Sequence, residues 1–309
     1  MKLQTFFTEL QKLIDSYPKV PSNIVSSENC EYGNKLFFSK NLSYCFDDAH
    51  CTDGLFVYDS YMSPSCVDCD YCIESELCYE SVDAFKCFNS SYLENCGSVR
   101  DSMYSYNCIN CHDVFGCVNL QNKSFCIFNR QVSEAEYRKI LPRYAGWPAE
   151  KVLAMVRELK QRFPLTQTNE AHNENSPYGN YVYFSKNCYM SFDAGHNEES
   201  GYLYDSFYNK TCFDTTYAAQ NNQLSYEVVD SGDVFNCNYA VYSTTCHDSS
   251  YIFNCSNVKD SLGCVSLSNK QYCILNRQLT KEHYEIVKAE IFSQLEKEKL
   301  GWSSLQFAS

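Results

Sequence analysis

Cysteine is the residue type with the greatest chemical potential in this chain. Twenty cysteines occur among 309 residues, and several of them are separated by only two residues. The two closely spaced groups are Cys66, Cys69 and Cys72, and Cys108 and Cys111. A two-residue gap lets two thiolates reach one tetrahedral ion, so this spacing is typical of zinc and iron–sulfur sites. These five cysteines are therefore candidate metal ligands, with zinc as the candidate ion.

A second interpretation of the cysteines is structural. All 13 cysteines of the first half of the chain fall at residue numbers divisible by three, so a two-residue gap arises wherever neighbouring positions of that period both carry Cys. The second half has Thr215, Ala218 and Val258 where the first has Cys69, Cys72 and Cys111. Because Thr, Ala and Val cannot ligate zinc, this pattern favours cysteine as a small, polarisable core residue.

Two motifs with histidine also suggest chemistry. The segment from Cys108 to His112 matches the CxxCH pattern of haem attachment, but its duplicate ends in Lys259. His50 and His196 occupy equivalent FDxxH segments, where an Asp–His pair could orient an imidazole for acid–base catalysis. In a repeat protein, Asp or His at a turn more often bonds neighbouring backbone. No phosphate loop, nucleophile elbow or informative carboxylate pair is found, so we predict that the chain is not an enzyme.

The elements that position these residues come from a tandem duplication. YGNKLFFSKN at 32–41 recurs as YGNYVYFSKN at 178–187, and NKSFCIFNRQ at 122–131 recurs as NKQYCILNRQ at 269–278. The offset changes from 146 to 147, which indicates one inserted residue near Ser225. We expect two modules, residues 1–146 and 147–309.

A shorter period lies within each module. Consecutive nonapeptides such as FNCNYAVYS, TTCHDSSYI, FNCSNVKDS and LGCVSLSNK place small or aliphatic residues in three fixed columns. A strict short period with small inward residues predicts a mainly β fold of two tandem β-solenoids, at residues 34–131 and 180–278. A β-sandwich with coincidental spacing is the alternative. Two nonapeptides would form a coil of about 18 residues, which would bring pairs such as Cys108 and Cys126 within disulfide reach.

Helices are expected at the ends of the solenoids. Apolar residues recur at helical spacing from Leu3 to Ile14, Ser133 and Glu136 form a capping box, and Thr280 is a candidate N-cap of the last helix. Pro148 opens a further helix before the second solenoid. The segments 18–27 and 166–177 are expected as extended linkers. We expect these helices to cover the solenoid ends and to leave the side walls for binding.

The overall charge excludes some partners. Lys and Arg number 25 against 38 Asp and Glu, so the formal net charge is -13. We therefore expect no general binding of nucleic acid and no attraction to anionic membranes. Because neither a signal peptide nor an apolar run of ~20 residues is found, we expect a cytoplasmic location with reduced thiols.

The closing segment carries a resemblance. Cys108–Tyr137 resembles the end of the repeat arrays in a Cys-rich family of predicted proteins from uncultured bacteria, which close on a motif of the form NKxYCIFNxQ. The second copy repeats this ending at Asn269–Gln278. Members are often labelled zinc-ribbon-like, and the resemblance implies no particular activity.

These observations predict a non-enzymatic scaffold or binding module. Outward Tyr, Phe, Asn and Asp suit contact with a protein or a glycan, because aromatic rings supply area and amides supply hydrogen bonds. The candidate binding residues are Tyr58, Tyr79, Tyr106, Tyr204 and Tyr226. A metal-binding or redox protein based on the Cys-dense first copy is the alternative, and homo-oligomerisation stays open.

Overall fold

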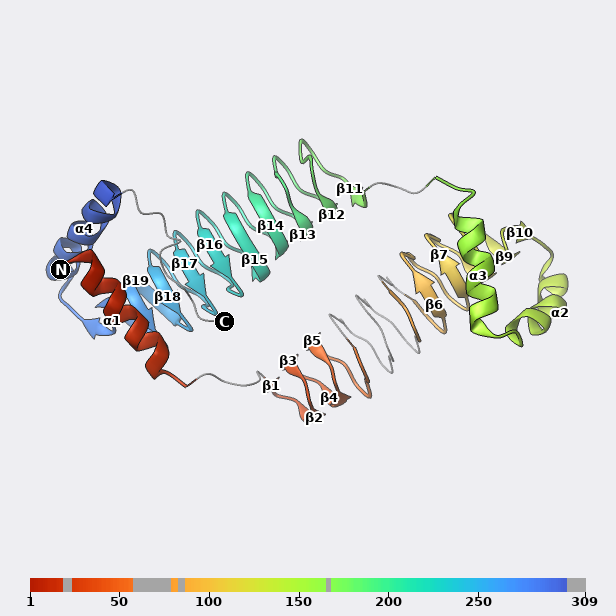
Figure 1. The fold of residues 1–309 in the computed structure, drawn as a ribbon, viewed down its shortest axis with the longest axis horizontal. Helices are drawn as coiled ribbons and strands as arrows, with labels where there is room; N and C mark the ends of the chain where they lie inside the picture. Colours follow the sequence, from red (N-terminus) through yellow and green to blue (C-terminus); the bar gives the residue numbers. More distant parts are fainter. Residues whose placement is uncertain (19–23, 58–78, 83–86, 165–167, 299–309) are drawn as a thin grey trace. The chain divides into compact units, whose positions relative to one another are not determined.

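A computed structural model describes residues 1–18, 24–57, 79–82, 87–164 and 168–298. They form two compact units, one of Val20–Leu165 and one of Met1–Lys19 with Thr166–Ser309 (Figure 1). The first unit contains β1 (Ile24–Val25), β2 (Glu28–Glu31), β3 (Asn34–Phe37), β4 (Lys40–Ser43), β5 (Phe46–Ala49), β6 (Ser91–Glu94), β7 (Met103–Tyr106), β8 (His112–Phe115), β9 (Ser124–Ile127), β10 (Arg130–Gln131), α2 (Glu134–Ala145) and α3 (Ala149–Lys160).

The second unit begins with the first helix of the chain. It contains α1 (Leu3–Ser16), β11 (Glu170–Ala171), β12 (Asn180–Tyr183), β13 (Phe192–Gly195), β14 (Gly201–Phe207), β15 (Phe213–Gln220), β16 (Tyr226–Val229), β17 (Asn238–Val241), β18 (Ser250–Phe253), β19 (Ser256–Val265), β20 (Ser268–Ile274), β21 (Arg277–Gln278) and α4 (Lys281–Glu298).

Both units are β-solenoids, as the sequence predicts, but the coil is shorter than expected. Parallel partners pair at an offset of 12, for example Asn34 with Phe46 and Asn238 with Ser250. One coil therefore contains four triplets of residues, and the expected coil of two nonapeptides is wrong. The solenoids also begin earlier than residues 34 and 180, because β1 and β11 pair with β3 and β12 inside the segments expected as linkers.

The triplet is the structural unit of each coil. In Cys246-His247-Asp248, the cysteine is buried, the histidine points outward, and the aspartate has a φ of 50°. Such left-handed backbone recurs at every third residue on residues other than glycine, at a cost of ~1 kcal/mol each. Hydrogen bonds between coils offset this cost, as when Asp248 N donates to Phe235 O at 2.9 Å. The described cysteines of the first module all occupy the inward position of a triplet, which explains their numbering.

The inserted residue of the second module lies earlier than expected. Tyr204 pairs with Thr216 at an offset of 12, whereas Ser206 pairs with Ala219 at an offset of 13. The extra residue therefore lies between Thr216 and Ala219 rather than near Ser225. The strands continue in register after it, so the solenoid absorbs the insertion as a local bulge.

Helices cover the last coil of each solenoid. Each array ends in a short antiparallel pair, β9 with β10 and β20 with β21, followed by a helix. Backbone N–H groups of Glu136 and His283 donate to the hydroxyls of Ser133 and Thr280, which confirms both expected N-caps. α3 packs on the first solenoid, whereas α1 packs on the second although it precedes the first. The expected boundary between residues 146 and 147 is therefore corrected.

Candidate binding surfaces and the thiol core

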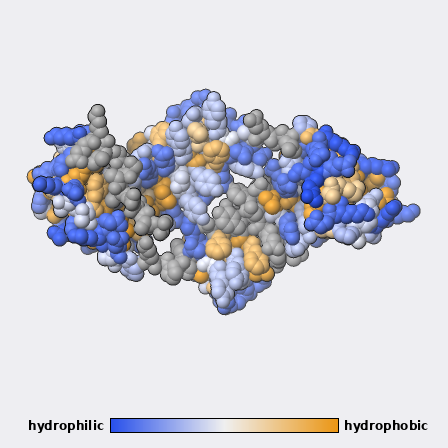
Figure 2. All heavy atoms as spheres, in the orientation of Figure 1, coloured by the Kyte–Doolittle hydropathy of each residue, from blue (hydrophilic) through white to orange (hydrophobic). Residues whose placement is uncertain are grey.

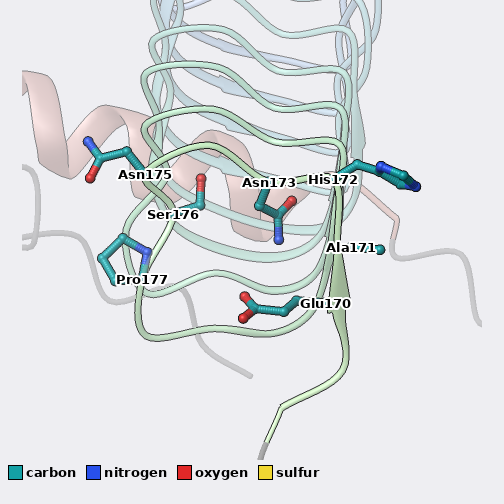
Figure 3. A pocket seen from close by; sticks show the side chains of 7 residues that line it. All are labelled: Glu170, Ala171, His172, Asn173, Asn175, Ser176 and Pro177. Atoms are coloured by element: carbon teal, nitrogen blue, oxygen red, sulfur yellow. The ribbon is translucent and has the colours of Figure 1, made fainter.

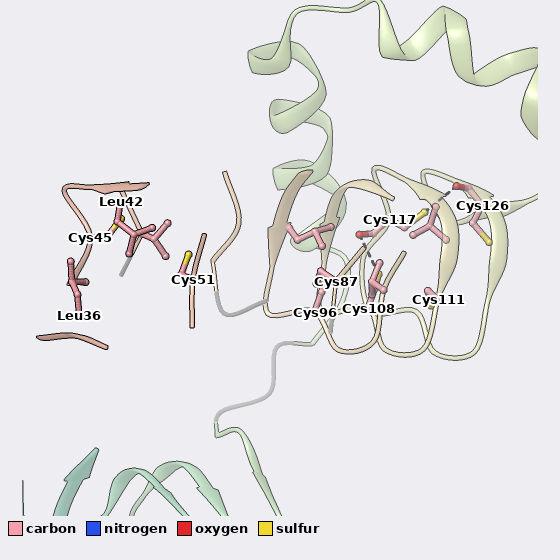
Figure 4. Packing of buried hydrophobic residues seen from close by; sticks show 14 residues of the cluster. Leu36, Leu42, Cys45, Cys51, Cys87, Cys96, Cys108, Cys111, Cys117 and Cys126 are labelled. Carbon is pink, nitrogen blue, oxygen red and sulfur yellow. Dashed lines mark hydrogen bonds between the residues drawn. The ribbon is translucent and has the colours of Figure 1, made fainter. Parts of the chain in front are cut away.

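Buried thiols fill a large part of both solenoids. Figure 4 shows those of the first module. Several inward cysteines place their thiol within hydrogen-bond distance of two backbone carbonyls, one two residues earlier and one nine residues later in the chain. Cys117 Sγ, for example, lies 3.4 Å from Phe115 O and 3.5 Å from Cys126 O. Cys237 repeats this arrangement in the second module with Phe235 O and Cys246 O, both at 3.4 Å. Cysteine therefore acts as a small core residue whose S–H satisfies the turns of the coil.

The environment of these thiols opposes ionisation. Burial raises the pKa of Cys212 to about 11 and the pKa values of Cys237 and Cys255 to about 12. A hydrogen bond to Cys108, together with burial, raises the pKa of Cys111 as well. Since the thiolate is the reactive and metal-binding form, these groups are held in the unreactive state.

The five candidate metal ligands divide into two sets. Cys108 and Cys111 are buried neighbours on adjacent triplets, and Cys66, Cys69 and Cys72 lie outside the described residues. Within the described parts of the chain, no three His, Cys, Asp or Glu side chains converge in a way that could hold a metal ion.

The coil length also changes the expected disulfide pairs. With four triplets per coil, Cys96 and not Cys126 lies one coil from Cys108. The expected stacking of Cys108 on Cys126 is therefore wrong, because these two cysteines are one and a half coils apart. Of the 16 cysteines that the structure describes, 15 are buried.

The two candidate catalytic histidines belong to rows of stacked rings. His196 lies between Phe184 and Tyr208, with ring centroids 4.9 Å and 4.7 Å away and planes within 6° of parallel. His50 stacks on Phe38 at 5.3 Å in the first module. Both imidazoles are exposed and occupy corners of the coil, so they extend an aromatic row from one coil to the next.

The aromatic row of the second module is part of a face with three parallel rows. We define it as His172, Phe184, His196 and Tyr208, which stack on four consecutive coils. Beside it runs a charged row in which Lys186 bonds Glu174 at 3.0 Å and Lys210 bonds Glu198 at 2.9 Å. An amide row follows, starting with Asn175 and Asn187, whose side chains bond at 2.9 Å. This face presents aromatic edges, charges and amides in fixed register.

The five candidate tyrosines have different environments. Tyr79 and Tyr204 are 42% and 53% exposed, as the binding hypothesis requires. Tyr226 is half-buried, and burial together with a hydrogen bond to Glu227 raises its pKa to about 12. Tyr58 lies outside the described residues. Figure 2 shows apolar surface between hydrophilic regions on the visible face.

Tyr106 contributes to packing within its module. Lys160 Nζ of α3 lies 3.5 Å from the centroid of the Tyr106 ring. The same ammonium bonds Glu94 at 2.9 Å. The ring therefore supports the covering helix by a cation–π contact.

A cavity lies at the first coil of the second module, in a segment that the sequence indicated as a linker (Figure 3). Its volume is about 420 Å³, and its lining residues are Glu170, Ala171, His172, Asn173, Asn175, Ser176 and Pro177. Asn173 is held by two hydrogen bonds, from its amide to Val182 O and from Ser185 N to its carbonyl. Among the described residues of this unit, α1 and α4 pack on the last coils rather than on this first one. The polar, proline-containing sequence of residues 166–177 gave no indication that this segment forms a coil of the solenoid.

The fold defines the class: this is a repeat protein of two β-solenoids with helices over their last coils. No known protein family matches the chain, and no curated protein matches it. Among solved structures, it is similar to "UDP-N-acetylglucosamine O-acyltransferase (LpxA) from Moraxella catarrhalis RH4" at 12% sequence identity. The alignment covers 93% of this chain and 86% of that chain, and its TM-score of 0.10 carries no argument about function. No helix in the described residues is long and apolar enough to cross a membrane.

Proposed function

We propose that this chain is a non-enzymatic binding scaffold whose solenoid walls contact a protein ligand. The observation that carries the proposal is the regular exposure of aromatic side chains on consecutive coils. Phe184 and Tyr208 of the aromatic row are 53% and 56% exposed, and Tyr204 on another wall is 53% exposed. Aromatic residues in ordered rows supply contact area at low entropic cost, which is why they are enriched in interfaces.

Ring orientation favours a protein over a glycan as the ligand. In the aromatic row the ring planes are nearly parallel and about one coil apart, so each inner ring packs both faces against its neighbours. Only the ring edges are directed outward. A sugar packs on the face of an aromatic ring, whereas a protein surface can combine edge contacts with the adjacent charged and amide rows.

The chemistry of the polar groups supports a non-enzymatic role. The thiols of Cys108 and Cys111 are buried with raised pKa values, and a thiol in that state is a poor nucleophile. His50 and His196 have their ring faces packed in stacked pairs. These side chains act as parts of the repeat rather than as a reacting constellation.

The test is a comparison of wall variants with a matched control. The full chain is cross-linked to its partners in cell extract, and each captured protein is purified and titrated against wild type, Phe184→Ser with Tyr208→Ser, and Ile286→Ser. Ile286 is 59% exposed and lies on α4 rather than on a solenoid wall, so it controls for loss of apolar surface. We expect a purified partner to lose at least tenfold in affinity for the double variant only. Equal binding to all three proteins, or binding to a glycan array without a protein partner, overturns the proposal.

A further inference from the structure

α1 packs on the last coils of the second solenoid, although the first solenoid is nearer to it in the sequence. Leu3, Phe6, Leu10 and Ile14 form one buried stripe, with exposed fractions of 7% or less. They pack on a surface that we call the end socket, formed by Tyr239, Tyr251, Leu262, Gly263, Val265, Ile274, Leu275, Tyr284, Ile291 and Leu295. α1 thus covers the last coils and α4 within one compact unit (Figure 1).

Polar contacts fix both ends of α1 in the end socket. At its start, the amino group of Met1 bonds Glu290 at 2.7 Å. The side chain of Gln294 accepts from Leu3 N at 2.9 Å and donates to Met1 O at 2.8 Å. Beyond its end, Asn276 donates to the hydroxyl of Tyr17 at 3.2 Å. These contacts set the register of the helix, so the socket recognises a particular helix rather than any apolar surface.

At the centre of the end socket, the Phe6 ring packs against Gly263. Gly263 has a φ of +66°, and a Cβ at this position would lie 2.6 Å from the ring. The Leu275 side chain lies 3.3 Å from the same point. Glycine and leucine together leave the volume that Phe6 fills, so a larger side chain at either position would exclude the ring.

The first module fills the equivalent place differently. Gly116 corresponds to Gly263 and has a φ of +63°, but there the Phe128 ring lies 2.5 Å from the position of a Cβ. Phe128 corresponds to Leu275, and in the covering helix Val152 corresponds to Phe6. Phe128 and Val152 belong to one apolar cluster. In the second module the helix supplies the large side chain and the solenoid the small one, and in the first module this is reversed. The difference matches α1 to the second module and α3 to the first.

We propose that the end socket also binds α1 of a second copy of this chain, so that two chains exchange their N-terminal helices. Every contact of α1 described above is with residues 239–295, at the opposite end of the sequence. The interface is therefore the same whether helix and socket belong to one chain or to two. Binding within one chain is favoured at low concentration, and exchange is favoured as the chain concentration approaches the effective concentration of the tethered helix.

Two complementary variants of the full chain test the proposal. Phe6→Val leaves a cavity in its own socket, and Leu275→Phe excludes its own Phe6. Each variant alone should melt roughly 5 °C below wild type. When the two are mixed, exchange places the new valine against the new phenylalanine, as in the first module, and Phe6 against Leu275, as in wild type. We expect differently tagged chains to form a heterodimer, detected by native mass spectrometry, whose melting temperature returns to that of wild type.

Two further measurements keep the test decisive if a single variant folds poorly. One chain with both Phe6→Val and Leu275→Phe should regain most of the lost melting temperature. If it does not, the side chains at positions 6 and 275 are not matched in volume as described. Isotopically labelled and unlabelled wild-type chains should form mixed dimers at high concentration. If the mixture of variants and the mixture of wild-type chains both contain only monomers, the proposed exchange of helices is wrong.

Discussion

The side chain of Asn276 takes both backbone hydrogen bonds of Val265 at the end of the second solenoid. Its carbonyl accepts from Val265 N and its amide donates to Val265 O, each at 2.8 Å. Asn129 makes the same pair of bonds with Val118 in the first module, again at 2.8 Å. The asparagine of the repeated closing motif therefore replaces a strand, and it protects an edge that would otherwise pair with another chain.

Asn129→Ala should destabilise the first module. It leaves a backbone donor and acceptor of Val118 without their partner, which costs about 1–3 kcal/mol in the free energy of unfolding. The control is Asn110→Ala, which also places alanine on left-handed backbone and removes only an exposed amide that bonds Asn122 on the next coil, so it should cost ~1 kcal/mol from the backbone alone. Urea unfolding of both variants measures the difference. Equal costs would show that Asn129 does not close the array.

Cys111→Val should be tolerated, because Val258 already occupies the equivalent position and is fully buried. We expect a cost of about 1 kcal/mol or less by thermal unfolding. Elemental analysis of wild type, the variant, and Cys69→Thr addresses the metal hypothesis directly. One equivalent of zinc in wild type that disappears with either substitution would establish the metal-binding alternative.

Thiol reactivity should depend strongly on folding. Cys30 is half-buried, whereas the other described cysteines are buried. A thiol reagent should therefore modify few groups in the native protein, and Cys30→Ser should remove a fast phase of the reaction. In denaturant, close to 20 thiols should react, because the chain contains 20 cysteines. Recovery of only a handful would favour disulfides.

Stability should fall in alkaline solution. Burial raises the pKa of Cys212 from 9.0 to about 11 and that of Cys237 to about 12. Between these values and 9.0 the unfolded chain loses protons that the folded chain keeps, so the free energy of unfolding decreases as pH rises. The contribution is complete below pH 9 and is lost progressively up to about pH 12. Urea midpoints at increasing pH measure this decrease, and Cys212→Ser should make it shallower. A midpoint that rises with pH contradicts the prediction.

Tyrosines of the walls and of the covered end should respond differently to substitution. Tyr106→Ser removes the ring under Lys160 and should lower the melting temperature by several degrees. Tyr204→Ser removes an exposed ring and should leave the melting temperature nearly unchanged. Differential scanning calorimetry compares the two. A similar fall for Tyr204→Ser would assign that ring to packing and count against a binding wall.

The inward positions could be predicted from the sequence, but the coil length could not. Small side chains every third residue identify the core, and both Cys117 and Cys237 lie there. A coil of four triplets and a coil of six triplets would both keep the same columns of small residues inside. The choice depends on left-handed corners at residues such as Asp248 and Asn236, whose φ values are 50°. The chain has only 11 glycines, and among those that the structure describes only Gly116 and Gly263 have such a backbone, so its usual sequence signal is missing.

The pairing of helices with solenoids was also beyond the sequence pattern. The stripe of Leu3, Phe6 and Leu10 shows that α1 needs an apolar partner, and both modules offer one. The choice depends on the volumes of Leu275 and Phe128, which matter only once the coils place them beneath the helices. Similarly, Asn276 acquires its role from the edge that it meets, which no linear motif describes.

The placement of the helices on the final coils leaves the length of each array free to vary during evolution. Deleting or duplicating four consecutive triplets removes or adds one whole coil, and every remaining side chain keeps its wall, its corner and its neighbours. The single extra residue between Thr216 and Ala219 shows that smaller changes persist only as a bulge. Related genes should therefore differ in length by whole coils of four triplets, with the closing asparagine and the helix that follows it retained.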